Sequence, residues 1–195
     1  MPVEMKHIWK SYGEQKVLAD FSLTIKEGEK VCLMGASGIG KTTVLSILAG
    51  LVRPDAGEVT GIKGKKLSMV FQEDRLIEWA DAFENVALVL EQKKSQALWD
   101  FLRGEFDAVG LQDYEGKPVA QLSGGMKRRV ALVRAVCARG EFLLLDEPFT
   151  GLDQGTKEQV AGYLNSRTAK NTVVMVAHDI QDAECLGARI VLCKK

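Results

Sequence analysis

One short glycine-rich segment constrains the fold of this chain more than any other feature. Residues 35–42 read Gly-Ala-Ser-Gly-Ile-Gly-Lys-Thr, between the dense apolar run Glu29–Met34 and the periodic segment Lys41–Leu51. The spacing G-x-x-x-x-G-K-[ST] between a buried strand and a helix is typical of a phosphate-binding loop. Its glycines allow backbone N–H groups to point at phosphate oxygens, and the helix N-terminus adds a positive end. We therefore expect Lys41 to reach the β- and γ-phosphates and the Thr42 hydroxyl to bind Mg²⁺.

Strands and helices alternate on both sides of this loop. The patterns predict strands over 6–12, 17–25, 29–34, 67–71, 142–145, 172–177 and 190–193, and helices over 41–51, 81–91, 96–109, 126–138, 156–168 and 180–187. Strands that alternate with helices imply an α/β fold with a mainly parallel sheet and right-handed crossovers. The helical stretch in the middle of the chain interrupts this alternation, so we expect it to form a lobe of its own.

Length and charge restrict the class of protein. The 195 residues fit one domain, in which about 1–80 and 140–195 form the core and about 81–139 form a helical subdomain. Lys plus Arg and Asp plus Glu both number 26, whereas a nucleic-acid or membrane-surface binder normally has a basic excess. The apolar runs are far shorter than the ~20 residues of a spanning helix, and the N-terminus lacks the pattern of a secretory signal. The four cysteines show no CxxC spacing, so we expect buried thiols in a reducing compartment rather than a metal site.

Two acids follow the apolar run Leu143–Leu145. A carboxylate at the carboxyl end of a parallel strand faces the nucleotide crevice. We expect Asp146 to bind Mg²⁺, directly or through a water, and Glu147 to act on the attacking water as a base or an orienting group. The alternative, two solvated acids at a strand end, is disfavoured by the phosphate-binding loop upstream.

A second anion site is predicted at residues 122–126, Leu-Ser-Gly-Gly-Met. Ser123 is a favourable helix cap, and Gly124 and Gly125 leave backbone N–H groups bare at a helix N-terminus. The segment resembles the signature motif of the ABC ATPases, Leu-Ser-Gly-Gly-Gln, with Met126 in the last place.

Four further residues match that family in order and spacing. Tyr12 lies where the family has an aromatic that stacks on adenine, Gln72 matches the Q-loop, Asp153 the D-loop and His178 the switch histidine. Tyr12 as a merely packed aromatic and His178 as a structural histidine are the alternatives. The resemblance covers nearly the whole chain and implies a P-loop NTPase core with a mainly parallel sheet, an N-terminal antiparallel β subdomain and an inserted helical subdomain.

The resemblance also implies an ATP-binding and ATP-hydrolysing subunit, with ATP and Mg²⁺, that powers solute transport through a separate membrane permease. The implied working state is a head-to-tail dimer in which the signature motif of one subunit completes the phosphate site of another, and an identical chain is the expected partner. The catalytic residues would be Lys41, Gln72, Glu147 and His178, and the metal ligands Thr42, Gln72 and Asp146. Nucleotide would be bound by Tyr12, Gly35, Ala36, Ser37, Gly38, Ile39, Gly40, Lys41, Thr42, Thr43, Ser123, Gly124, Gly125 and Asp153.

The segment 71–79 resembles the importer subfamily for nitrate, sulfonate, taurine and related small solutes, although Glu78 replaces the usual proline of a Leu-Pro-Trp run. This subfamily implies location at the cytoplasmic face of the membrane, a transmembrane permease, an extracytoplasmic solute-binding protein and no nucleic-acid partner. We expect Leu76, Ile77 and Trp79 to form an exposed apolar cluster for the permease. In the alternative interpretation, Trp79 packs inside the helical lobe.

Other classes of protein fit less well. Soluble ABC proteins that act on nucleic acid or ribosomes usually carry two ATPase halves or long coiled-coil insertions. A metabolite kinase needs no Ser-Gly-Gly element, and a non-catalytic module needs neither Glu147 nor His178. The basic residues of the 126–138 helix, Lys127, Arg128, Arg129 and Arg134, are interpreted as a solvated, partly paired face. The chain ends at Lys195, earlier than the family resemblance implies, so we expect a minimal version without an appended regulatory domain.

Overall fold

A parallel sheet of five strands runs through the middle of the molecule in the order β5-β6-β7-β3-β8. This computed structural model describes residues 1–92, 94–112 and 116–193. The adjacent pairs of this sheet are all parallel, which confirms the fold class expected from the alternation of strands and helices. The strands are β3 (Lys30–Met34), β5 (Leu67–Val70), β6 (Phe142–Asp146), β7 (Thr172–Val176) and β8 (Arg189–Leu192).

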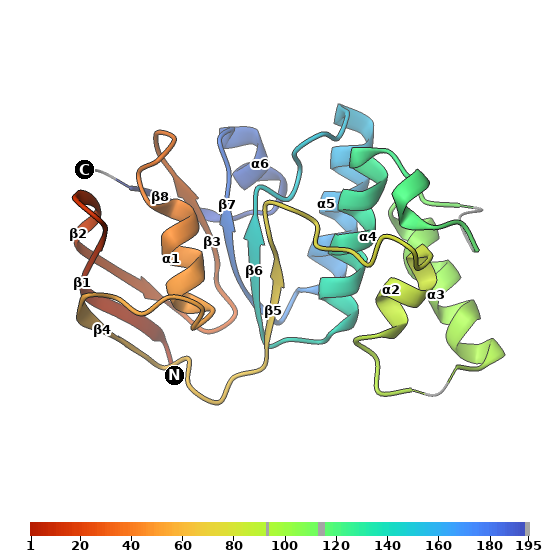
Figure 1. Ribbon diagram of the computed structural model, residues 1–195, viewed down its shortest axis with the longest axis horizontal. Coiled ribbons are helices and arrows are strands. Elements are labelled where there is room, and N and C mark those ends of the chain that lie inside the picture. Colours follow the sequence, from red (N-terminus) through yellow and green to blue (C-terminus); the bar gives the residue numbers. More distant parts are fainter. Residues whose placement is uncertain (93, 113–115, 194–195) are drawn as a thin grey trace.

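A smaller antiparallel sheet, in the order β2-β1-β4, lies at one end of the molecule (Figure 1). It consists of β1 (Val3–Tyr12), β2 (Gln15–Ile25) and β4 (Ala56–Thr60). The sequence patterns did not predict β4, because only Val59 of its five residues is even half-buried and no alternation results. Gly57 permits the close pairing with β1, since a Cβ there would lie 2.3 Å from the carbonyl oxygen of His7.

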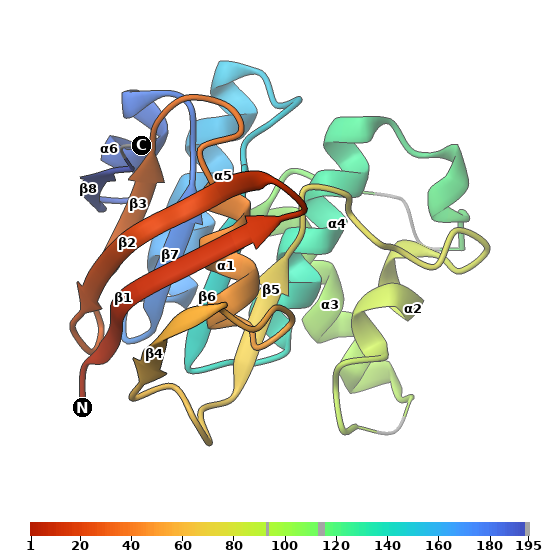
Figure 2. The ribbon, with the colours of Figure 1, turned by 60° about the vertical axis from the view of Figure 1, so that its left-hand side comes forward.

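The helices occupy both faces of the parallel sheet and the far end of the molecule. Helix α1 lies between the two sheets, whereas α2 and α3 lie at the end opposite the antiparallel sheet (Figures 1 and 2). No helix of the described ranges has the length and apolar character needed to cross a bilayer. The helices are α1 (Lys41–Leu48), α2 (Ala82–Ala87), α3 (Gln96–Ala108), the 3₁₀ turn η1 (Val119–Gln121), α4 (Gly124–Cys137), α5 (Gln154–Arg167) and α6 (Ile180–Cys185).

Helix α2 is shorter than the predicted range 81–91. Asp81 caps it, accepting a hydrogen bond from the Glu84 N–H, and Glu84 returns the bond in a capping box. Beyond Ala87 the backbone tightens, because Val89 N–H donates to Val86 at 3.2 Å and Leu90 N–H donates to Ala87 at 3.1 Å. These i→i−3 bonds close the helix with a turn of 3₁₀ geometry.

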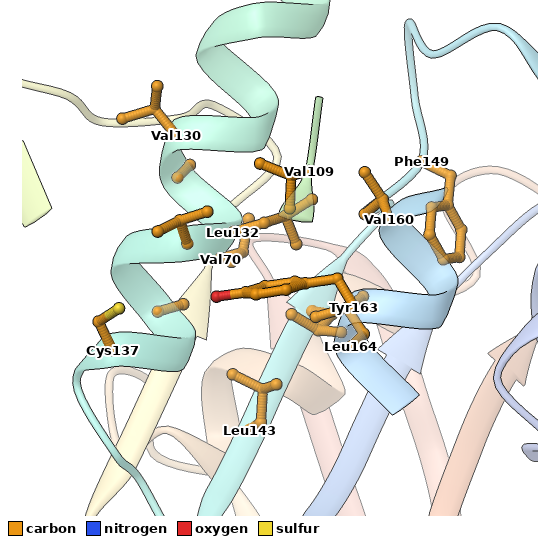
Figure 3. Packing of buried hydrophobic residues seen from close by; sticks show 14 of the residues in the cluster. Val70, Val109, Val130, Leu132, Cys137, Leu143, Phe149, Val160, Tyr163 and Leu164 are labelled. Carbon is orange, nitrogen blue, oxygen red and sulfur yellow. The ribbon is translucent and has the colours of Figure 1, made fainter. Parts of the chain in front are cut away.

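Strand β6 divides the interior into two apolar clusters because its side chains alternate between the two faces of the sheet. Phe142 and Leu144 pack with α1 and the antiparallel sheet. Leu143 and Leu145 pack with the helices on the other face, where α4 and α5 cover β5 and β6 (Figure 3). The continuous apolar run that predicted a buried strand therefore reflects burial on both faces.

A buried polar contact joins α3 to α5. The Glu105 side chain accepts a hydrogen bond from the Tyr163 hydroxyl at 2.7 Å and ion-pairs with Arg167 Nη2 at 2.6 Å. Glu105 is only 3% exposed. Burial raises the pKa of Tyr163 far above its usual range, so that its hydroxyl stays a donor. The helical end of the molecule is thus tied to the sheet core through a charged group.

Candidate functional site

The glycine-rich loop connects the end of β3 to the start of α1. The Lys41 side chain is only 6% exposed. Its ammonium group donates to the carbonyl oxygens of Gly35 at 2.8 Å and Ala36 at 3.0 Å. The loop therefore holds the ammonium group at the mouth of the helix N-terminus, where phosphate oxygens are favoured.

Gly40, directly before α1, has no acceptable substitute in this conformation. Its φ is +100°, and a Cβ would lie 2.8 Å from Leu18 Cδ2 and 2.9 Å from the Val17 carbonyl oxygen. The close approach of β2 and the left-handed backbone each require glycine here. The antiparallel sheet is thereby fixed against the loop.

Asp146, the last residue of β6, has a carboxylate oxygen without a hydrogen-bond partner among the described residues. Asp146 is 1% exposed, and its Oδ1 is buried without a partner among the described residues. Burial raises the pKa of this carboxyl, opposed by a hydrogen bond from the Thr42 hydroxyl. A buried anionic oxygen without a partner beside a hydroxyl suits a hard cation such as Mg²⁺, which prefers oxygen ligands. The residues present therefore fit the expected metal.

Glu147 and His178 face each other across the ends of β6 and β7. Their atoms Oε1 and Nε2 lie 2.7 Å apart, and the Thr150 hydroxyl donates to Glu147 Oε2 at 3.3 Å. Glu147 has a φ of +52°, a left-handed conformation that costs a non-glycine residue free energy. Such strain is often found at functional sites.

A single cavity of about 350 Å³ brings the predicted phosphate and water-activating groups together. Tyr12 borders it and is 51% exposed, with the ammonium of Lys10 at 5.6 Å from its ring centroid. The ring is thus available to stack on a flat ligand. The other predicted site residues that line the cavity are Ser37, Gly38, Gly40, Lys41, Thr42, Thr43, Gln72, Glu147 and His178.

A separate groove of about 610 Å³ contains the second predicted anion site. Ser123, Gly124, Gly125 and Asp153 line it, and none of them lines the first cavity, whereas Gln72 borders both. The Ser123 hydroxyl accepts from Met126 N–H at 3.3 Å, which confirms its role as the cap of α4. The structure thus brings the predicted residues together in two groups.

Asp153 also has a structural role that the family pattern did not suggest. Its carboxylate accepts from the Thr156 N–H at 3.0 Å and from the Thr156 hydroxyl at 2.7 Å. Asp153 is therefore the cap of α5, and these bonds lower its pKa.

The interpretation of the basic residues on α4 as a solvated face was wrong for Arg128. This side chain is 3% exposed and donates to the carbonyl oxygens of Asp146 and Glu147. Arg134 is half-buried and donates to the carbonyl oxygens of Asp74 and Arg75. A usable signal existed, because Arg128 shares the helix face of the apolar positions 131, 132 and 135 at spacings of three, four and seven.

The apolar cluster after Gln72 was predicted only in part. Trp79 is 83% exposed, so the alternative that it packs inside the helical lobe was wrong. Leu76, in contrast, packs against the apolar cluster beneath α4 and is not an exposed anchor. Trp79 instead borders a groove of about 480 Å³ together with Ala87 and Leu88.

The site combines a phosphate-binding loop after β3 with an Asp-Glu pair at the end of the parallel strand β6. This combination defines an ATPase of the P-loop class. Residues 18–150 match the family described as ABC transporter. The chain belongs to this family and is an ATP-hydrolysing subunit of the transport type.

Several known proteins are similar to most of the chain. An aliphatic sulfonates import ATP-binding protein, SsuB 1 of Agrobacterium fabrum, is 40% identical over 96% of this chain and 69% of the relative. A bicarbonate transport ATP-binding protein, CmpD of Synechococcus elongatus, is 38% identical over 92% of this chain and 69% of the relative. A dimeric ATP-binding cassette solved in a post-hydrolysis state with ADP and Pi has a TM-score of 0.86 at 32% identity, over 98% of this chain and 94% of that one.

Proposed function

We propose that this chain hydrolyses ATP with Mg²⁺ between two subunits and drives a membrane permease that imports a small solute. The observation that carries the proposal is the 2.7 Å contact between Glu147 and His178 at the mouth of the phosphate cavity. This contact orients a carboxylate toward the place where the terminal phosphate of a nucleotide would lie over Lys41. The relatives named for sulfonate import and bicarbonate transport, and one named for spermidine and putrescine import, support the choice of a small solute.

Each residue of the cavity has a distinct role in the proposed reaction. Tyr12 stacks on the base, and Lys41 with the loop N–H groups binds the β- and γ-phosphates. Thr42, Gln72 and Asp146 would hold Mg²⁺, which neutralises phosphate charge when it is bound. Glu147 orients the attacking water and accepts its proton as the oxygen–phosphorus bond to ADP breaks, while His178 keeps the Glu147 carboxylate in place.

The substitution Glu147→Gln tests the catalytic assignment. Hydrolysis should fall at least a hundredfold, because the amide cannot accept the proton, whereas ATP affinity should change little, since Lys41 still binds the phosphates. Steady-state phosphate release and fluorescent-ATP titration measure the two quantities. Glu158→Gln, an exposed change on α5, is the matched control and should behave as wild type. Wild-type turnover by Glu147→Gln would reject the assignment.

The dimer follows from the separation of the two sites. Ser123 and Gly125 do not line the phosphate cavity of their own chain, so a second copy placed head to tail would supply these N–H groups to the γ-phosphate. The dimeric cassette that resembles this chain supports the arrangement. The Glu147→Gln protein should therefore sediment as a dimer with ATP and as a monomer with ADP. The same oligomer with both nucleotides would contradict the sandwich.

We further infer that the groove beside Trp79 receives a cytoplasmic helix of the permease, which holds the subunit at the membrane. Trp79 and Leu88 are 83% and 63% exposed, and an exposed apolar pair around a hollow is typical of a docking site. Residues 81–139 would move as a subdomain with this helix, and Gln72 lies close by in the sequence. An extracytoplasmic binding protein would deliver the solute to the permease.

Paired substitutions test the docking site. Trp79→Ala with Leu88→Ala should abolish co-purification with the permease while basal hydrolysis remains, because neither side chain borders the phosphate cavity. Leu51→Ala, which removes another exposed leucine (60%) elsewhere on the surface, is the control and should keep the complex. Normal association of the double variant would place the permease elsewhere.

A further inference from the structure

One buried arginine outside the expected catalytic set contacts the backbone of both loops that carry catalytic groups. Arg128 extends from α4, and its Nη2 donates to the carbonyl oxygens of Asp146 and of Glu147, the latter at 2.7 Å. Its Nη1 donates to the Phe71 carbonyl oxygen at 2.6 Å and ion-pairs with Asp74 at 2.9 Å. The guanidinium thus bridges the end of β6 and the segment that follows β5.

We propose that Arg128 is a positioning residue for hydrolysis, which fixes the backbone of Glu147 by tying it to the loop that bears Gln72. The inference rests on the proposed role of Glu147 and extends it to a side chain that lies outside the phosphate cavity of the same chain. Arg128 lines the groove of the second anion site but not the phosphate cavity of its own chain. It therefore acts on the Glu147 of its own chain through the carbonyl groups that it binds.

The backbone of Glu147 needs such support. Its φ of +52° lies in the left-handed region, where a non-glycine residue costs on the order of 1–3 kcal/mol and persists only when the surroundings hold it. A charged donor on the Glu147 carbonyl oxygen stabilises this conformation, and the same nitrogen binds the preceding carbonyl. The side chain of Arg128 therefore fixes the two consecutive peptide groups at the end of β6.

The loop after β5 is held by the same side chain. Phe71 and Asp74 flank Gln72, and the Gln72 carbonyl oxygen itself lies 3.5 Å from Arg128 Nη1. Because both nitrogens belong to one planar group, a shift of either loop changes the contacts of the other. A lysine ammonium has the charge but not the planar fork that spans two loops.

Packing alone gives no reason for an arginine at this position. Its Nε is buried without a partner in the described part of the chain, and an unsatisfied buried donor is unfavourable. An apolar side chain would avoid this penalty, but it would remove the donor that the carbonyl oxygens of Phe71, Asp146 and Glu147 share. The guanidinium is explained instead by the five polar groups that it contacts at the end of β6 and in the segment after β5.

The substitution Arg128→Lys tests the proposal because it keeps the charge and most of the volume. We expect kcat for ATP to fall at least tenfold while KM and fluorescent-ATP affinity stay within threefold, since Lys41 and the glycine loop remain. Lys127→Gln, the adjacent basic residue on α4, is the matched control and should keep wild-type kcat. Circular dichroism and urea unfolding check that both variants are folded, and an additional Arg128→Met variant should show the same loss of kcat.

A double variant separates positioning from general stability. If Arg128 acts through Glu147, then adding Arg128→Lys to Glu147→Gln should leave the residual single-turnover rate unchanged within twofold. A further tenfold loss in that background, or a kcat within twofold of wild type for Arg128→Lys alone, would overturn the inference. An active Glu147→Gln protein would instead defeat the proposed function, so the two failures are distinguishable.

Discussion

The contact between Glu105 and α5 predicts a specific loss of stability. Glu105→Gln keeps the size and shape of the side chain but removes the negative charge that faces Arg167 Nη2 at 2.6 Å. The amide oxygen still accepts the hydrogen bond from the Tyr163 hydroxyl. Glu105→Leu removes this acceptor as well and leaves a buried hydroxyl without a partner.

The structure gives the order and size of the two effects. A hydrogen bond to a charged group contributes about 1.5–3 kcal/mol, but the Arg167 side chain is 48% exposed and regains water when the pair is lost. We therefore expect Glu105→Gln to lower the free energy of unfolding by about 2 kcal/mol. Glu105→Leu should lower it by about 4 kcal/mol, since an unsatisfied buried hydroxyl adds about 1–3 kcal/mol.

Urea unfolding followed by circular dichroism measures both losses. With a slope of about 2 kcal/mol per molar urea, the Gln variant should shift the midpoint by about 1 M. Arg103→Gln, which removes an exposed ion pair with Asp100 on the same helix, should shift it by less than about 0.3 M. The reasoning would be refuted if Glu105→Gln had the same urea midpoint as Arg103→Gln, or if Glu105→Leu were no less stable than Glu105→Gln.

Three further outcomes are expected. Tyr12→Ala should weaken ATP and GTP binding alike by about tenfold, because stacking is insensitive to the base, and calorimetric titration that shows a loss for ATP alone would indicate a base-specific pocket. Gly40→Ala should lower the free energy of unfolding, measured in urea, by about 1–3 kcal/mol and should also lower ATP affinity. The control Gly162→Ala lies at an exposed position of α5 with open space around it, and it should raise the free energy of unfolding by about 0.5–1 kcal/mol. Burial raises the pKa of Cys137 to about 12, so iodoacetamide at pH 8 should label the half-exposed Cys185 and spare Cys137, as peptide mass spectrometry would show.

The phosphate cavity could be predicted from the sequence because its parts are local. A glycine-rich loop between a strand and a helix, and two acids after the run Leu143–Leu145, are each defined by a few consecutive residues. The parallel sheet then brings these strand ends together without further information. His178 was predicted from its match to the switch histidine of the family, and it too lies just beyond the end of a strand, β7.

The features that escaped prediction depend on contacts between distant segments. Strand β4 has no alternating pattern and exists through its pairing with β1, which Gly57 permits. The helix pattern places Arg128 on the apolar face of α4, but its partners at the ends of β5 and β6 are distant in the sequence. Leu76 and Trp79 are close in sequence, yet one is packed beneath α4 and the other points to solvent, a difference that composition alone does not encode.

Helix α5 has a mechanical consequence that its sequence does not suggest. Its first turn is capped by Asp153 at the edge of the second groove, and its last residue, Arg167, ion-pairs with Glu105 of α3. Fourteen residues at a rise of 1.5 Å make a rigid rod of about 21 Å between these points. Helix α5 therefore keeps the loop around Asp153 and the Glu105 contact at a fixed spacing, so that a shift of this loop along the helix axis would strain the Glu105 contact.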